Sequence, residues 1–249
     1  MLKFGNDILK VGNDWIDAVD YNPLNLPSHT IRLLYEDDVV PRFSRGTAVQ
    51  VSESPNIWDL TYEDNHWGSL LSSDMTLLEV LGANATGVTN MAAMFYYCGH
   101  LRKVALFDTS AVTSTYSMFY YCSHLVTIPL FRTTNVTCMR EMFINCYQLE
   151  TVPLLDMSNV TESDYMFGYC RSLKSIPLFN TSSIYDMHGM FYNCPNVETG
   201  ALALYQQASS QAIPPQYHNG TFYNCGKDTT TGAAELAQIP SDWKQEFKP

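Results

Sequence analysis

The chain has 249 residues and a formal net charge of −11, with 46% hydrophobic and 16% charged residues. This composition is typical of a folded protein with an ample core, and it excludes a disordered tail. The 14 Lys and Arg residues form no run, which argues against binding to a nucleic-acid backbone or to an anionic membrane surface.

Residues 1–20 predict a small N-terminal β-hairpin, because a Gly-Asn-Asp turn between apolar residues occurs twice. A hairpin of this size has too little core to stand alone. We therefore expect it to dock onto the rest of the chain, a sister copy or a larger assembly. Residues 21–30 are typical of a linker. The apolar side chains expected to make the docking contact are Phe4, Ile8, Val11 and Trp15.

Residues 31–76 are expected to form an N-terminal cap that seals the repeats that follow. Runs of β-branched and aromatic residues predict short strands at 31–35, 39–40, 48–51 and 57–62. Residues 67–71 predict a helical turn that leads into the first repeat.

Residues 77–196 contain five repeats of 24 residues, marked by a motif of the form Met-Phe-x-x-Cys. A fixed period of this length indicates stacked supersecondary units. The motif occurs at Met94–Cys98, Met118–Cys122, Met142–Cys146, Met166–Cys170 and Met190–Cys194.

Each repeat predicts a short strand, a polar turn and a short helix. The strand pattern is Leu101-x-x-Val104-x-Leu106, in which Val104 and Leu106 are expected to point inward. In the next segment, Met, Phe and Cys recur at helical spacing and are expected to form core. The predicted fold class is therefore an α/β repeat, a leucine-rich-repeat solenoid with a short-stranded parallel sheet on its concave side.

Five of the seven cysteines share one phase of the repeat, Cys225 belongs to a later degenerate copy, and Cys138 is out of phase. A column of identical residues favours buried free thiols. Disulfides stay open as the alternative if neighbouring Cα atoms come within roughly 7 Å.

Residues 197–249 predict a degenerate repeat and a C-terminal cap. The spacing from Cys194 to Cys225 is 31 residues, seven more than the period, which indicates an insertion. Residues 233–239 predict a final short helix, and the tail after it contains Trp243.

Two columns of side chains are candidate binding surfaces. The Phe/Leu column of the strand segments forms an apolar stripe if it is exposed, which usually marks an interaction site. The alternative is that the strand bends and tucks these rings into the next turn. Tyrosines of the helical segments suit protein or sugar recognition if exposed, and the alternative is packing between repeats. The candidate residues are Lys103, Phe107, Thr127, Phe131, Thr151, Leu155, Phe179, Tyr96 and Tyr120.

We find no motif for catalysis, nucleotide binding or a cofactor, so the sequence predicts a protein that is not an enzyme. The nearest approach to a metal site is Cys98-x-His100 with Cys122-x-His124, a ligand set that suits zinc. The histidine column continues as Gln148, Ser172 and Asn196, as an exposed polar position would, so we expect no metal.

The repeat resembles that of BspA-like leucine-rich repeat surface proteins, on a motif seen nearly whole from Leu173 to Cys194. The flanking segments are similar to those found beside such repeats in gut bacteria and their phages. This resemblance implies adhesion or recognition of a protein or glycan on a cell surface, with no catalytic residues.

The sequence predicts no signal peptide and no membrane insertion, because it has no long apolar run. We therefore expect a phage virion appendage, such as a tail or head fibre protein, that contacts other virion proteins through its N-terminus. The alternatives are a bacterial cell-surface adhesin and a cytoplasmic scaffold. A homo-oligomer is compatible with each.

Overall fold

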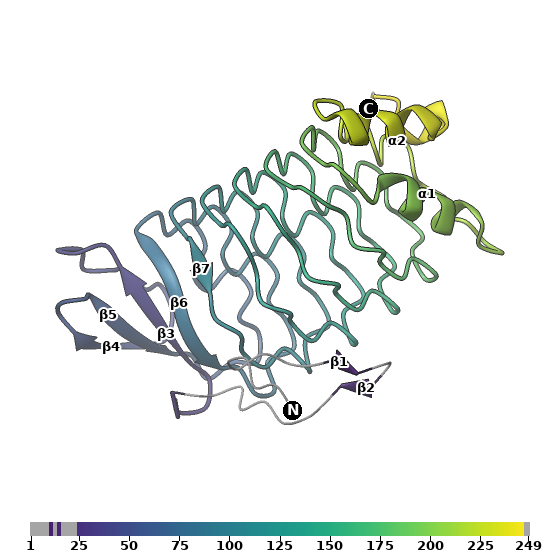
Figure 1. Ribbon diagram of the computed structural model, residues 1–249. Helices are drawn as coiled ribbons and strands as arrows, with labels where there is room; N and C mark the ends of the chain where they lie inside the picture. The colour runs from purple at the N-terminus through teal and green to yellow at the C-terminus, as the bar shows by residue number, and fades with distance from the viewer. Residues whose placement is uncertain (1–9, 12–13, 16–23, 247–249) are drawn as a thin grey trace.

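The computed structural model describes residues 10–11, 14–15 and 24–246 (Figure 1). A β-sheet lies at one end of the molecule, and two helices, α1 (Ala201–Ser209) and α2 (Thr230–Gln238), lie at the other. Between them the chain runs in successive coils that lie side by side, each made by one repeat. Apart from this, strands β1 (Lys10–Val11) and β2 (Asp14–Trp15) pair antiparallel.

The sheet has five strands in the order β4-β5-β3-β6-β7. These are β3 (Thr30–Tyr35), β4 (Thr47–Ser52), β5 (Ile57–Thr61), β6 (Leu77–Asn84) and β7 (Lys103–Val104). All pairs are antiparallel except β6 with β7, which is parallel. The strands expected at 31–35, 48–51 and 57–62 are confirmed as β3, β4 and β5, but residues 39–40 form no strand.

Alternating apolar residues of β3 pack into the core, and one of them also bonds to the first coil. Ile31, Leu33 and Tyr35 are buried, as period-two alternation requires of a strand with one covered face. The Tyr35 hydroxyl donates a hydrogen bond of 2.9 Å to Oδ2 of Asp74, which lies at the end of that coil. On the neighbouring strand β5, Asp59 accepts two hydrogen bonds from Arg32, at 2.7 and 2.8 Å.

The Met-Phe-x-x-Cys segments form consecutive turns, and alternate backbone N–H groups in them bond to different partners. The N–H groups of Ala93, Phe95 and Tyr97 donate to carbonyl oxygens 23 residues ahead, in the next coil. The N–H groups of Met94, Tyr96 and Cys98 donate to the carbonyl three residues back. The same alternation recurs along the coils and constitutes what we call the coil ladder.

Two residues of each coil have positive φ, which an α-helix excludes. In the second coil these are Ala93 (φ 55°) and Tyr97 (φ 60°), and Ser117 and Tyr121 follow in the third. These left-handed residues interrupt a helical path, and Ala93 and Tyr97 each donate the N–H to the next coil, as Phe95 between them also does. The expected helix in each repeat is therefore absent, and residues 67–71 form the first coil of the ladder rather than a helical turn.

The predicted fold class, an α/β leucine-rich-repeat solenoid, is wrong. The described part of the chain contains one open, mixed five-stranded sheet and two short α-helices, both of them after the repeats. On the side where a parallel sheet was expected, only the first two members, β6 and β7, reach strand length in the described residues. Further along, this side has single bridges, such as Thr127 with Thr151 and Ser175 with Thr199. Pro129, Pro153 and Pro177 lack the N–H that a continuous ladder needs.

The core of the coils is a phenylalanine ladder, as the Met-Phe-x-x-Cys cadence predicted. Phe119, Phe143 and Phe167 are fully buried and stack in parallel, with centroids 5.4 Å apart at each step. The in-phase cysteines lie beside the rings, and each of those from Cys98 to Cys194 donates its S–H to the backbone carbonyl 27 residues earlier. The in-phase cysteines and Cys225 are buried, which confirms that part of the expectation; all seven cysteines are free, and Cys138 is partly exposed.

The C-terminal residues close the open end of the coils. Helix α1, which the sequence did not predict, falls in the insertion, whereas α2 agrees with the helix expected at 233–239. After the insertion the coil ladder resumes, with Phe191 N–H donating to the Thr221 carbonyl. The buried ring of Trp243 then stacks on His218 at 4.3 Å, and its carbonyl accepts from Phe222 N–H.

Candidate functional site

The Phe/Leu column proposed as a binding surface lies in the core. Phe107, Phe131, Leu155 and Phe179 are each 2% exposed or less. The rings of Phe131 and Phe179 pack against Phe119 and Phe167 of the phenylalanine ladder, at 6.4 and 6.0 Å. These residues therefore cannot contact a ligand, and the alternative in which the chain tucks them inward is correct.

Three-residue turns explain why this column points inward. The N–H groups of Phe131, Leu155 and Phe179 each donate to the carbonyl of the proline two residues back, at 2.9 Å. Such a turn reverses the local direction of the chain, so that the side chain after it faces the core. Of the leucines at the centres of these turns, Leu154 and Leu178 face solvent, whereas Leu130 is partly buried against the core.

The expected inward position of the Leu106 column is accordingly wrong for its later members. Leu154 is 49% exposed and Leu178 is 55% exposed. The proline just before these leucines is the sequence signal that could have indicated the bend. The remaining candidates on this side, Lys103, Thr127 and Thr151, are exposed as a binding surface requires.

The tyrosine candidates lie at the surface and touch one another. We define the tyrosine face as Tyr96, Tyr97, Tyr120, Tyr121 and Tyr147. The Tyr96 and Tyr120 rings stack at 4.7 Å, and those of Tyr97 and Tyr121 stack at 4.9 Å. Tyr97 is 37% exposed and the other four are half-buried, so the rings form a continuous aromatic surface that solvent reaches.

The coil ladder fixes the spacing of these rings. Tyr97 and Tyr121 occupy left-handed positions, at φ 60° and 59°, and each donates its N–H to the next coil. Because equivalent residues of adjacent coils are held by these bonds, their rings stack without further support. The guanidinium of Arg171 lies over the Tyr147 ring, 5.0 Å from its centroid, in a cation–π contact.

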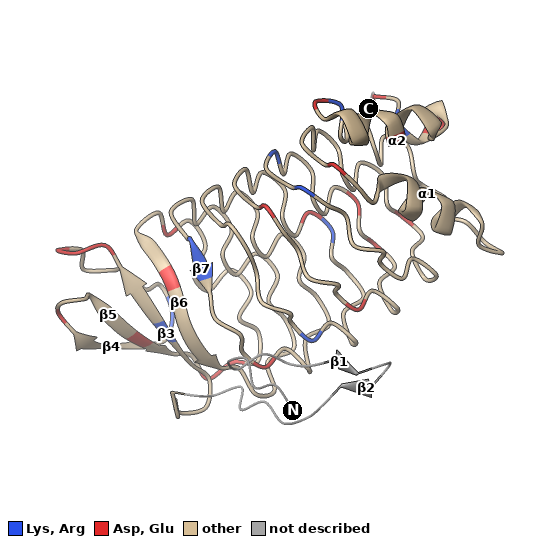
Figure 2. Cartoon of the chain, viewed as in Figure 1, with Lys and Arg blue, Asp and Glu red and all other residues tan. Residues whose placement is uncertain are grey.

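The tyrosine face is uncharged at neutral pH. Burial against neighbouring rings raises the pKa of Tyr96, Tyr120 and Tyr147 above its ordinary value, so these phenols keep their protons. A face of aromatic rings with O–H donors and acceptors suits a polar, uncharged ligand surface. Figure 2 shows acidic and basic residues scattered along the coils rather than gathered in one basic patch.

A second tyrosine cluster follows on later coils. Tyr192 stacks on Tyr223 at 4.6 Å and lies 5.5 Å from Tyr169 and 5.8 Å from Tyr165. The spacing of tyrosines in the sequence does not show which of these rings meet.

The four side chains considered for zinc do not converge. Cys98 and Cys122 are fully buried and donate to backbone carbonyls, whereas His100 and His124 are exposed. The two imidazoles contact each other edge to face at 5.6 Å, and Nδ1 of His100 lies 2.8 Å from Glu36.

Of the expected docking residues, Phe4 and Ile8 lie outside the described residues. Val11 belongs to β1 and Trp15 to β2. The antiparallel pairing of these strands agrees with a hairpin at this position, and what it docks onto stays a prediction.

Comparison with protein families gives one match. Residues 74–176 match the family described as "Mycoplasma protein of unknown function, DUF285". The matched segment covers less than half of the chain and includes the tyrosine face. The comparisons with curated proteins and with solved structures give no match. Among the described residues, no helix has the length and hydrophobicity to cross a bilayer.

Proposed function

We propose that this chain is a non-enzymatic recognition module that binds its ligand, a protein or a glycan, on the tyrosine face. The observation that carries the proposal is the stacking of solvent-accessible tyrosines on adjacent coils. Tyrosine offers a large contact area and a hydroxyl group with few rotatable bonds, so it loses little entropy on binding. The coil ladder holds the backbone, which lowers the ordering cost further.

The resemblance of the repeat to BspA-like surface proteins also favours recognition or adhesion. We further propose that the chain is displayed on a phage virion, with a bacterial cell surface as the alternative setting. Mass spectrometry of purified particles separates the two, because a virion protein is present in them at a fixed copy number. Absence from purified particles contradicts the virion setting but leaves the recognition role intact.

The binding role is tested with a glycan and protein screen on the full chain. For any ligand found, the double variant Tyr97→Ser/Tyr121→Ser should bind at least about tenfold more weakly, since aromatic residues at the centre of an interface carry most of its energy. A matched control is Leu154→Ser/Leu178→Ser, which removes two exposed apolar side chains from the opposite segment of the coil. Loss of binding in the control with retention in the tyrosine variant would place the ligand on the leucine side and overturn the proposal.

A further inference from the structure

Where the last two coils of the ladder meet, a carboxylate, an imidazole, a phenol and an amide lie side by side, a combination that the earlier pairs of coils lack. Asp186 and His188 lie on one coil, and Tyr217 and Asn219 lie beside them on the next. Asp186 forms a bridge with Tyr217, and Gly189 N–H donates to the Asn219 carbonyl. At the equivalent positions, the second and third coils carry Asn90 and Ala92, then Ser114 and Tyr116.

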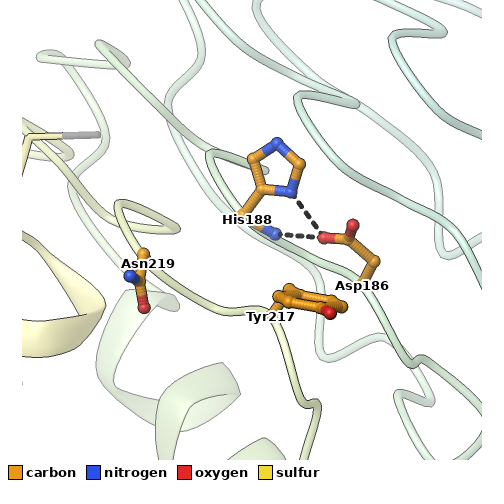
Figure 3. Close-up of a pocket in the computed structure, with 4 residues that line it drawn as sticks. All are labelled: Asp186, His188, Tyr217 and Asn219. Carbon is orange, nitrogen blue, oxygen red and sulfur yellow. Dashed lines mark hydrogen bonds and ion pairs between the residues drawn. The ribbon is translucent and has the colours of Figure 1, made fainter. Parts of the chain in front are cut away.

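These four side chains surround a hollow of about 270 Å³. In Figure 3 the ring of Tyr217 forms one wall, His188 and Asp186 lie across from it, and Asn219 stands at the far side. The volume is below the range of pockets that hold drug-sized molecules, so it suits a ligand of about one sugar ring.

The carboxylate and imidazole in the hollow are held in a fixed orientation. Oδ1 of Asp186 accepts a hydrogen bond of 3.0 Å from the His188 backbone N–H and lies 2.6 Å from Nδ1 of the same residue. The bond to Asp186 is the main cause that raises the pKa of His188. On the other side of the imidazole, the Tyr165 ring packs edge to face at 5.1 Å. Groups held in this way are pre-organised for a ligand.

The aromatic wall is open to solvent. Tyr217 and Tyr185 are each 48% exposed, and their rings meet edge to face at 5.3 Å. An exposed ring face carries partial negative charge, which attracts the slightly positive C–H bonds of an apolar ligand face. A pyranose ring has such a face, and its rim of hydroxyls matches an amide that both donates and accepts and a carboxylate that accepts.

The charges near the hollow disfavour an anionic ligand. Asp186 and the exposed Glu162 are acidic, and the buried Asp164 lies nearby with Arg140 beside it, at 2.9 Å. The basic groups here, Arg140 and His188, are already paired with Asp164 and Asp186. A carboxylate or phosphate group would therefore find no unpaired cation among these residues and would face the exposed Glu162, whereas a neutral ligand needs no charged partner.

We propose that Tyr217, Asp186, His188 and Asn219 form a subsite for one neutral sugar residue of a glycan. This inference rests on the proposed recognition function and names the ligand class at one place. Tyr165 links the subsite to the second tyrosine cluster, because its ring contacts both His188 and Tyr192. A longer glycan therefore extends from the subsite along the tyrosines.

The test is calorimetric titration of the full chain with neutral methyl glycosides and short neutral oligosaccharides, and with N-acetylneuraminic acid as the anionic comparison. We expect saturable binding of at least one neutral sugar and none of the anionic one. Tyr217→Ala should weaken that binding at least tenfold, whereas Tyr217→Phe, which keeps the ring, should retain most of it. The matched control Tyr116→Ala removes a ring of similar exposure, 40%, from an earlier coil and should leave the affinity unchanged. Unchanged melting temperatures show that the variants are folded.

Three outcomes overturn the inference, and they differ in what they say about the recognition role. If neutral sugars bind but Tyr217→Ala has no effect while Tyr97→Ser/Tyr121→Ser abolishes binding, the subsite is wrong and the recognition role stands. If a protein binds through the tyrosine face and no sugar binds, the subsite is again wrong and the recognition role again stands. If neither class of ligand binds, both proposals fail.

Discussion

The phenylalanine ladder leads to a prediction about how much stability each ring contributes. Phe143 is stacked on both sides, on Phe119 at 5.4 Å and on Phe167 at 5.4 Å, with interplanar angles of 4° and 7°. Phe95, near the N-terminal end, stacks on Phe119 at 5.3 Å. Both side chains are fully buried, so burial alone does not distinguish them.

We expect Phe143→Leu to destabilise the protein more than Phe95→Leu. An aromatic pair contributes about 0.5–1.5 kcal/mol beyond the area it buries. Phe143→Leu removes two such pairs, or about 1–3 kcal/mol, and Phe95→Leu removes one, or about 0.5–1.5 kcal/mol. Each variant also loses a smaller and similar amount from the change in side-chain volume, which cancels in the comparison.

Equilibrium urea unfolding measures the two free energies of unfolding. Circular dichroism reports on the whole chain, and tryptophan fluorescence reports on both ends, because Trp67 lies in the first coil and Trp243 closes the last. Met142→Leu is the control, since this change conserves volume and touches no ring pair; it should cost less than about 1.5 kcal/mol. Equal losses for Phe143→Leu and Phe95→Leu would refute the argument that stacking, rather than burial, sets the difference.

Three further predictions concern single sites. Burial raises the pKa of Asp164 to about 6, and Arg140 opposes the rise. Because the protonated carboxyl is favoured in the folded protein, the stability that it contributes is fully present below about pH 4 and is lost as the pH rises through about 6. Asp164→Asn should therefore gain stability relative to the parent between pH 4.5 and pH 7.5, by up to about 3 kcal/mol in urea unfolding; a gap that does not widen with pH contradicts this. Gly200 has φ 101°, and a Cβ there would overlap the Ile176 carbonyl oxygen, so Gly200→Ala should lower the melting temperature. Ala203→Gly in the exposed part of α1 should cost only about 1 kcal/mol. A thiol reagent at pH 8 should label Cys138 first, because it is partly exposed, and the six buried cysteines only on unfolding. Burial raises the pKa of Cys138 too, but the other six are also closed to the reagent, and the pKa of Cys194 rises to about 12; mass spectrometry of Cys138→Ser should then show no fast label.

The sequence was sufficient to find the core of the coils but not the path of their backbone. Met, Phe and Cys spaced three and four residues apart are buried by a helix and equally by consecutive turns, so periodicity could not separate the two. The deciding feature is the conformation of Ala93, Ser117 and Glu141, which have positive φ although none is a residue that favours it. The weak signal was Asn145 and Asn193 in the equivalent column four residues later.

Of the candidate binding surfaces, the tyrosine face could be predicted in part from the sequence, and the hollow near Asp186 could not. Tyr96 and Tyr120 were found because they recur at one period. The hollow near Asp186 was missed because the insertion shifts the register: a strict 24-residue step places Ser210 opposite Asp186, whereas Tyr217 lies there. The position at which the coil ladder resumes is evident only in the structure.

That the ladder resumes at all has a consequence for how such a chain changes over time. Each coil presents the same row of donors to one neighbour and of acceptors to the other, so a coil fits against any other coil. Gene duplication or deletion of whole 24-residue units then alters the length of the tyrosine surface without a new core having to be designed. The segment between Cys194 and Tyr217 shows that the connections, too, can lengthen, since extra residues there leave the bonding of the next coil intact. Copy number and connection length are thus two independent variables with which this architecture can be matched to ligands of different size.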